Sequence, residues 1–161
     1  AYGYCASKDE HYYGFIGHVR INFNGALSGF MLTPANGSER DAMLAMSDNI
    51  TGVMLADKGF ISADLQTKLA NQNIELQTPF RKNMDDNRNP DFVKWIISTR
   101  RLVETVIGQL TERFKINKIR VKTFFHLQAR IARKLISHSL ATTIAKKLGL
   151  DATNLNGIIT T

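Results

Sequence analysis

The sequence predicts an α/β protein, and three observations carry that prediction. Apolar and polar residues alternate along two early segments that flank a turn signal. Residues 53–76 have the pattern of a strand, a helix and a second strand. From residue 92 onward, apolar residues recur at helical spacing. We therefore expect a mixed sheet with flanking helices and a helical C-terminal half.

An antiparallel hairpin is expected in residues 13–34. Apolar positions alternate with polar ones along its first strand, at Tyr13, Phe15, Val19, Ile21 and Phe23. Asn24 and Gly25 follow, and this pair is a strong hairpin signal because a type I′ turn needs positive φ at both positions. A second strand, roughly residues 26–32, should complete the hairpin.

A βαβ unit is expected next. Ser38 should cap a short helix that continues to Met46. Val53–Ala56 is a compact apolar run, typical of a strand buried on both faces. Ser62 should cap a second helix, with Leu65 and Leu69 one turn apart. Residues 74–76 alternate as the next strand, which should run parallel to the first with a right-handed crossover.

The remainder of the chain is expected to be a linker and two helices. Residues 81–91 are polar and lack periodicity, so they should form a loop. The helix after it should bury one apolar stripe, formed by Ile96, Val103, Ile107, Leu110 and Phe114. A second helix, from about His126 to Leu148, should face inward with Leu127, Ile131, Leu135, Ile144 and Leu148. Gly149 should end this helix in a Schellman motif. We place the domain at residues 1–150 and a C-terminal tail at 151–161.

The charge is unevenly distributed along the chain. Residues 1–90 hold 8 Lys and Arg against 10 Asp and Glu, whereas residues 91–161 hold 13 against 4. The whole net charge of +7 therefore comes from the second half. This asymmetry favours a polyanionic partner such as nucleic acid, and the alternative is an ordinary solvated basic surface.

Several other classes of protein are disfavoured. No segment approaches the roughly 18 apolar residues that span a bilayer, and the first ten residues lack the pattern of an export signal. Cys5 is the single cysteine, so an internal disulfide is impossible, and no pairing suggests a zinc site. These features fit a reducing cytoplasm. The scattered histidines are expected to be structural, and Phe124 and Phe125 are expected in the core rather than as platforms on which bases stack.

Asp57 is the first candidate for chemistry. It directly follows the apolar run 53–56 and precedes Lys58 and Gly59. Ligands of open α/β sheets gather at the carboxyl ends of parallel strands, so its carboxylate would lie at a functional edge. The alternative is that Asp57 only caps the following turn.

Glu104 is the second candidate. It lies at the margin of the apolar stripe, with Arg100 and Arg101 one turn before it. An exposed pair of this kind contributes only a few tenths of a kcal/mol, and by itself that surface interpretation is favoured. Gly108, one turn after Glu104, costs a helix about 1 kcal/mol relative to Ala. Its missing side chain would leave room for a metal or a phosphate.

Two carboxylates far apart in sequence can converge to hold divalent metal. Mg²⁺ and Mn²⁺ prefer oxygen ligands, and a pair of these ions can bind the attacking and leaving oxygens of a phosphodiester displacement. We expect Asp57 and Glu104 to meet across a shared cleft, and we expect a third carboxylate to complete the set.

Five stretches of the sequence carry a family resemblance. They are YGYCASKDEHYYGFIGHV, FMLTPANGSERD, LADKGF, IELQTPFRKN and RRLVETVIGQLTERFKINKIRVKTFFHLQARI. Together they resemble the catalytic domain of bacterial insertion-sequence transposases of the DDE class, which have an RNase H-like fold. The resemblance covers residues 2–148, and it is specific because the LADKGF and RRLVETVIGQL segments occur together at this separation.

The resemblance implies a mechanism and its residues. Asp57 and Glu104 would be catalytic and would ligate Mg²⁺ or Mn²⁺. With a first aspartate they would activate water to nick a transposon end, and the freed 3′-OH would attack target DNA. In such families the first aspartate ends the first strand, which here would lie before Ala1. We therefore expect no strand transfer from this chain alone.

The absent first strand has a structural consequence as well. In an RNase H-like sheet that strand is central, so its loss would leave a gap with an unpaired edge on each side. We expect another strand to fill the gap, either by re-pairing within the chain or by exchange with a second copy in a homo-oligomer.

Basic side chains, nearly all of them in the second half, are expected to bind the phosphates of double-stranded DNA, at transposon ends and at the target. Such a protein would work in the bacterial cytoplasm, associated with the nucleoid. The candidates are Lys58, Arg100, Arg101, Arg113, Lys115, Lys118, Arg120, Lys122, Arg130, Arg133 and Lys134.

Two other functions stay open at this point. A truncated transposase could act as a DNA-binding or assembly module without catalysis. An unrelated phosphotransfer domain could use Asp57 as its acceptor, but such a domain should end in alternating βα units. The helical second half argues against that alternative.

Overall fold

The computed structural model describes residues 1–5 and 9–155 and divides the chain into two compact units. Unit 1 consists of Ala1–Arg20 and Gly29–Arg100, and unit 2 of Ile21–Ser28 and Arg101–Thr161. The domain boundary expected at residue 150 stays a prediction. Unit 1 contains most of the strands, and unit 2 contains the tip of a hairpin and most of the long-helix residues.

Unit 1 begins with a hairpin that the sequence pattern did not predict. β1 (Tyr2–Cys5) pairs antiparallel with β2 (Glu10–Tyr13), with Tyr2 opposite Tyr13. Glu10 therefore lies in a strand. The alternation of apolar residues continues through Gly14, so the pattern does not show that β2 ends at Tyr13 and a new strand begins at Phe15.

The hairpin expected in residues 13–34 is confirmed, with β3 (Phe15–Ile21) beside β4 (Leu27–Pro34). The type I′ turn is wrong, because Gly25 has a φ of +77° but Asn24 does not have a positive φ. The Gly25 N–H donates to the Asn22 carbonyl, and the Asn22 N–H donates to the Ala26 carbonyl. This is a three-residue loop that needs a left-handed residue only at Gly25.

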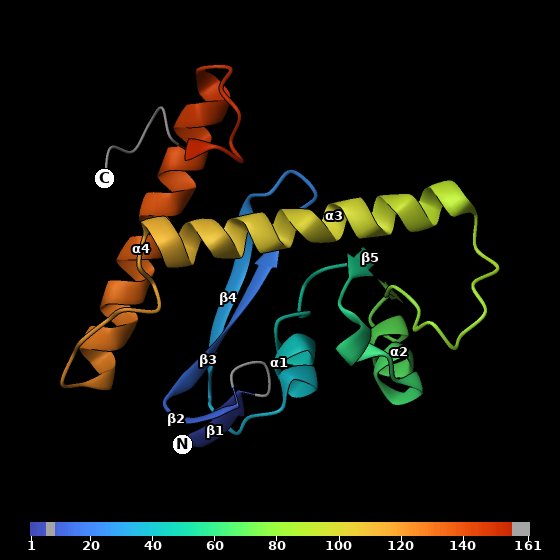
Figure 1. Cartoon of the computed structure of the whole chain (residues 1–161), viewed down its shortest axis with the longest axis horizontal. Helices are drawn as coiled ribbons and strands as arrows, with labels where there is room; N and C mark the ends of the chain where they lie inside the picture. Colours follow the sequence, from blue (N-terminus) through green and yellow to red (C-terminus); the bar gives the residue numbers. More distant parts are fainter. Residues whose placement is uncertain (6–8, 156–161) are drawn as a thin grey trace. The chain divides into compact units, whose positions relative to one another are not determined.

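The βαβ unit is confirmed (Figure 1). β5 (Gly52–Leu55) pairs parallel with β6 (Ile74–Gln77), and α2 (Ala63–Ala70) connects them. The predicted N-caps are also confirmed. Ser38 Oγ accepts from the Asp41 N–H before α1 (Glu39–Ala45), and Ser62 Oγ accepts from the Leu65 N–H before α2.

The main core of unit 1 forms beneath this parallel pair. It is built from four buried residues of α2 and β6, namely Leu65, Leu69, Ile74 and Leu76. Met43 and Leu44 of α1 pack against them. Val53 on β5 is 39% exposed, so the expectation that β5 is buried on both faces is wrong. In the part of the chain that the structure describes, β5 has a single partner strand. It is therefore an edge strand.

The described strands form three separate two-stranded sheets, so the expected single mixed sheet is not present. Among the described strands, the β3–β4 pair and the β5–β6 pair do not join, so re-pairing between these strands does not fill the expected gap. Exchange of a strand with a second copy stays a prediction.

The predicted loop before the first long helix is confirmed and has an internal anchor. Residues 78–89, all of which the structure describes, contain no helix or strand between β6 and α3 (Pro90–Gly108). Arg88 organises this loop by donating to Asp86, to Gln77 Oε1 at 2.8 Å and to the Thr78 carbonyl at 3.1 Å. Its guanidinium also lies 3.9 Å from the centroid of the Phe80 ring.

The apolar stripe of α3 is partly confirmed. Ile96 and Leu110 are buried, but Val106 replaces Ile107 on the inward face. Val103, Val106 and Leu110 are spaced three and four residues apart, so they define a narrow stripe that leaves Ile107 to one side. A turn of π-helix, η2 (Gln109–Arg113), ends α3.

The inward face of α4 (Phe124–Lys147) differs from the expected one. Ile131 is buried, and Leu127 and Leu135 are half-buried, but Ile144 and Leu148 are exposed. Ala141 and Ala145 face inward in their place because Leu155 packs against them. Gly149, with a φ of +69°, ends the helix in the predicted Schellman motif, in which the Leu150 N–H donates to the Ala145 carbonyl.

A buried polar cluster joins the elements of unit 2. Gln109 Nε2 donates to the carbonyls of Ala152 and Thr153, at 3.1 and 2.9 Å. Its Oε1 is therefore the acceptor for His138, whose Nε2 lies 2.8 Å away and must carry the proton. His138 is fully buried, and its Nδ1 has no partner among the described residues. The expectation of a structural role for this histidine is confirmed.

The core of unit 1 makes a direct prediction about stability. Leu69 is 0% exposed, so Leu69→Ala should lower the free energy of unfolding by about 2–5 kcal/mol. Leu148→Ala, at an exposed leucine, is the control and should change it by less than about 0.5 kcal/mol. Urea unfolding followed by circular dichroism measures both. Equal effects of the two substitutions would contradict this packing.

His138 predicts a pH dependence of stability. Burial lowers the pKa of His138 below its ordinary value of 6.5, so the unfolded chain takes up the proton at a higher pH than the folded chain. The stability that the neutral ring contributes is present above pH 6.5 and declines as the pH falls below it. His138→Gln keeps a donor for Gln109 and should make this decline shallower, as measured by urea midpoints between pH 7 and pH 5, while the remaining part comes from His18, whose pKa is also lowered by burial. A parallel decline in the variant would contradict the assignment.

Candidate catalytic carboxylates and nucleic-acid interface

Asp57 lies at the carboxyl end of β5, as the sequence predicts. The parallel pairing extends one residue beyond β5, because the Ala56 N–H donates to the Gln77 carbonyl at 3.0 Å. Asp57 then caps the short helix η1 (Lys58–Phe60), and its Oδ1 accepts from the Lys58 N–H at 2.7 Å. The capping role considered from sequence is therefore real, and the carboxylate is exposed at the same time.

Arg100 is the charged partner of Asp57. Its Nε lies 3.6 Å from Asp57 Oδ1, and the two side chains are 42% and 55% exposed. An ion pair this exposed contributes at most about 1 kcal/mol to stability. The contacts that Lys58 and Arg100 make with Asp57 both fall on Oδ1, so among the described residues Oδ2 is accessible to a further ligand. The sequence spacing places Arg100 one helical turn from Glu104. It does not predict the contact between Arg100 and Asp57, because the two residues are 43 positions apart.

Glu104 is an exposed residue of α3, one turn after Arg100. Gly108 lies one further turn along the helix, and a Cβ added there would meet no atom within 4 Å. The space expected beside Gly108 is therefore present. In the part of the chain that the structure describes, no three His, Cys, Asp or Glu residues are grouped so that they could hold a metal.

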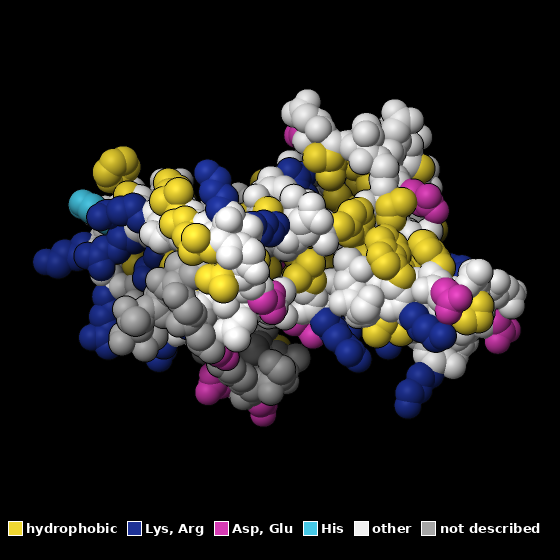
Figure 2. All heavy atoms as spheres, turned by 90° about the horizontal axis from the view of Figure 1, so that it is seen from above, with side chains coloured by type: hydrophobic (Ala, Val, Ile, Leu, Met, Phe, Trp, Pro, Cys, Tyr) yellow, Lys and Arg dark blue, Asp and Glu magenta, His cyan; other side chains and the backbone are white. Residues whose placement is uncertain are grey.

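The predicted DNA-binding residues are concentrated in unit 2. This unit holds 11 Lys and Arg against 3 Asp and Glu, a net charge of +8. Figure 2 shows Lys and Arg side chains gathered around the beginning of α4. Most of the predicted residues in this unit are exposed: Arg101, Lys115, Lys118, Arg120, Lys122, Arg130 and Arg133.

The other predicted cations have different surroundings. Lys134 is half-buried, and its ammonium donates to the Phe114 carbonyl, so this lysine holds α4 to the end of η2. Arg113 is also half-buried. In unit 1, Lys58 is exposed on η1 and Arg100 pairs with Asp57.

Two phenylalanines at the start of α4 contradict the sequence-based expectation. Phe124 is 49% exposed and Phe125 is 72% exposed, so neither belongs to the core. They lie between two basic segments, and the sequence alone favours burial over a base-stacking role for them. The buried face of α4 instead begins with the half-buried Leu127 and continues through Ile131, and residues 124 and 125 precede it.

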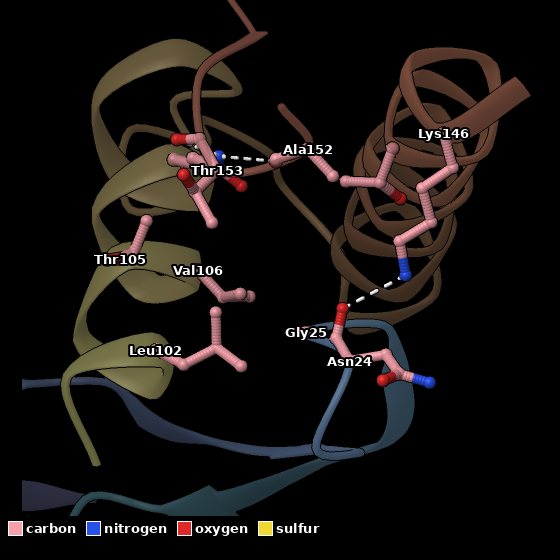
Figure 3. A pocket seen from close by; sticks show the side chains of 10 residues that line it. Asn24, Gly25, Leu102, Thr105, Val106, Lys146, Ala152 and Thr153 are labelled. Carbon is pink, nitrogen blue, oxygen red and sulfur yellow. Dashed lines mark hydrogen bonds between the residues drawn. The ribbon is translucent and has the colours of Figure 1, made fainter. Parts of the chain in front are cut away.

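Within unit 2, the hairpin tip contributes to a small pocket with α3 and α4 (Figure 3). Lys146 Nζ donates to the Asn24 carbonyl at 2.9 Å. Gly25 packs against α3, since a Cβ there would lie 3.2 Å from Leu102 Cδ1. Sequence analysis did not identify Lys146, because its partner lies 122 residues away and no local pattern links the two.

Comparison with known proteins identifies the family. The family model described as "Transposase DDE domain" matches residues 5–124, a span that includes both Asp57 and Glu104. None of the curated proteins and none of the solved structures compared with the chain gives a significant match. The match covers about three quarters of the sequence, and the chain belongs to the DDE transposase domain family.

Membership of this family supports a general function and a substrate. A transposase acts on DNA, and the basic surface of unit 2 agrees with such a partner. Among the described residues, no helix is long and apolar enough to cross a membrane.

Proposed function

We propose that the chain supplies part of the catalytic centre of an insertion-sequence transposase, which hydrolyses phosphodiester bonds at transposon ends and joins those ends to target DNA. The observation that carries this proposal is the family match, which spans Asp57 and Glu104. We assign an RNase H-like fold, supported by the β3–β4 hairpin followed by the β5–α2–β6 unit.

Asp57 and Glu104 are the proposed ligands of Mg²⁺ or Mn²⁺. Both are exposed carboxylates, and carboxylate oxygens are the donors that these ions prefer. Asp57 also has an oxygen, Oδ2, that is not used by Lys58 or Arg100. The donor chemistry therefore fits. Two carboxylates are few for such a site, so we propose that a further acid completes the set.

When bound, the ions would polarise the phosphodiester and lower the pKa of the attacking water. The protein residues supply position and charge. Arg100 can orient the Asp57 carboxylate through their ion pair, and the N-cap hydrogen bond from Lys58 holds the same oxygen. Exposed cations of unit 2 would bind the DNA phosphates and fix the position of the duplex.

A second candidate function is a DNA-binding or assembly module without catalysis. The observation that favours it is the combination of a strongly basic unit 2 with no group of three metal-binding side chains in the described chain. The two functions differ in metal dependence: the module would bind DNA in a salt-dependent way, but its carboxylates would not need a metal.

Metal binding provides the test of the catalytic proposal. Isothermal titration with MnCl₂ should show that Asp57→Asn and Glu104→Gln each weaken Mn²⁺ binding by at least about tenfold. Glu112→Gln removes an exposed carboxylate elsewhere in unit 2 and should leave binding within about twofold. The same variants should be compared for nicking of supercoiled plasmid in Mn²⁺. Unchanged Mn²⁺ affinity in Glu104→Gln would remove Glu104 from the site and favour the module.

Salt dependence provides the test of the DNA surface. The logarithm of the binding constant for duplex DNA should fall linearly with the logarithm of salt concentration. Lys118→Ala and Arg130→Ala should each reduce the magnitude of that slope by about 1. Lys68→Ala is the control, because Lys68 in unit 1 pairs with Asp64 and should leave the slope unchanged. Fluorescence anisotropy at several salt concentrations measures the slopes, and identical slopes for all variants would reject the proposed surface.

A further inference from the structure

The beginning of α4 presents an aromatic side chain that the core does not use. Phe125 is 72% exposed, although a phenylalanine is among the residues most often found inside proteins. It belongs to the first turn of a 24-residue helix whose N-terminus is capped by Thr123. Phe124, in the same helical turn, is also 49% exposed, so two adjacent aromatic residues are accessible to a partner at the start of α4.

Neighbouring residues hold the Phe125 ring in place. The ring packs edge-on against His126, with 5.8 Å between the ring centroids. His126 is fixed in turn, because its Nδ1 lies 2.7 Å from Thr123 Oγ1. The capping residue therefore positions both rings, which reduces the entropy lost when a partner stacks on them.

The electrostatic surroundings indicate the kind of partner. From Arg113 to Lys147 the chain contains 10 Lys and Arg and no Asp or Glu. Lys122 lies three residues before Phe125 and Arg130 five residues after it, and both are exposed. An exposed aromatic ring on a segment rich in exposed cations is the combination by which proteins hold single-stranded nucleic acid, with phosphates on the cations and a base on the ring.

We propose that Phe125 stacks on an unpaired DNA base while the adjacent cations bind the phosphates that flank it. This inference rests on the proposed function, because it assigns a substrate feature to the same DNA surface. Phe125 would thus recognise DNA in which a base has left the helix, as happens when a strand end is opened or a base is extruded. Intact duplex would contact only the cations.

The experiment compares two DNA probes of the same length and charge. One is a fully paired duplex, and the other carries 2-aminopurine opposite an abasic site, so that one base is unpaired. Phe125→Leu keeps an apolar side chain of similar size but removes the aromatic face, and Phe125→Trp retains one. Ile136→Ala is the matched control, because Ile136 is a 59% exposed apolar residue of the same helix.

Stacking predicts a difference between the probes. Phe125→Leu should weaken binding to the unpaired probe by about tenfold and change duplex affinity by less than about twofold, with the salt slope unchanged. Phe125→Trp should bind the unpaired probe at least as well as the native chain, with a matching change in 2-aminopurine fluorescence. Ile136→Ala should have no effect on either probe.

Other outcomes would overturn the inference and can be told apart from failure of the proposed function. If the native protein binds both probes with a steep salt slope and Phe125→Leu does not weaken binding of the unpaired probe more than that of the duplex, the stacking role is rejected. The proposed DNA surface is then retained. If neither probe binds at all, the DNA surface itself fails. If Phe125→Leu instead reduces only the binding of vesicles containing phosphatidylglycerol, the ring serves a lipid surface and stacking is rejected.

Discussion

The placement of Asp57 depends on the parallel pairing of β5 with β6. Hydrogen bonds of this pair extend through Ala56, so the chain leaves the strand at a fixed point and Asp57 begins the next element. Leu65 and Leu69 of α2 cover the pair and are almost completely buried. Loss of that packing would release the strand end, and with it the carboxylate that the proposed chemistry requires.

A second constraint organises unit 2. Gln109 uses both ends of its amide, one to hold the backbone at residues 152 and 153 and the other to accept from His138. The side chain thereby joins η2, α4 and the segment that follows α4. These hydrogen bonds fix how the three elements pack. An apolar residue of the same size at position 109 would leave two carbonyls and a ring nitrogen without partners.

Much of the local structure could be predicted from the sequence, because its causes are local. The β3–β4 hairpin, the βαβ unit, the caps at Ser38 and Ser62 and the helix stop at Gly149 each depend on residues a few positions apart. The β1–β2 hairpin was missed because the apolar alternation runs through Gly14 without a break. The turn at Gly25 was assigned to the wrong type because the Asn-Gly pair is compatible with more than one loop length.

Other features could not be predicted because they depend on contacts between residues far apart in the sequence. These features are the buried face of α4 and the ion pair of Asp57. Ala141 and Ala145 face inward because Leu155 packs against them, and the sequence of α4 contains no pattern that predicts this contact. Asp57 was expected at a strand end and lies there, but its ion pair with Arg100 depends on how α3 packs in unit 1. Local pattern indicates Asp57 as a candidate but favours a surface role for Glu104, and the family resemblance implies a catalytic role for both.

The charge imbalance of unit 2 also has a thermodynamic consequence for the folded protein. Eleven cations and three anions on one compact unit repel one another, and this self-repulsion opposes folding. A polyanion that binds the folded unit removes the repulsion and so adds to its stability. Added salt should then have two opposite effects. It screens the repulsion and so raises the stability of the free protein, and it lowers the affinity of the protein for DNA.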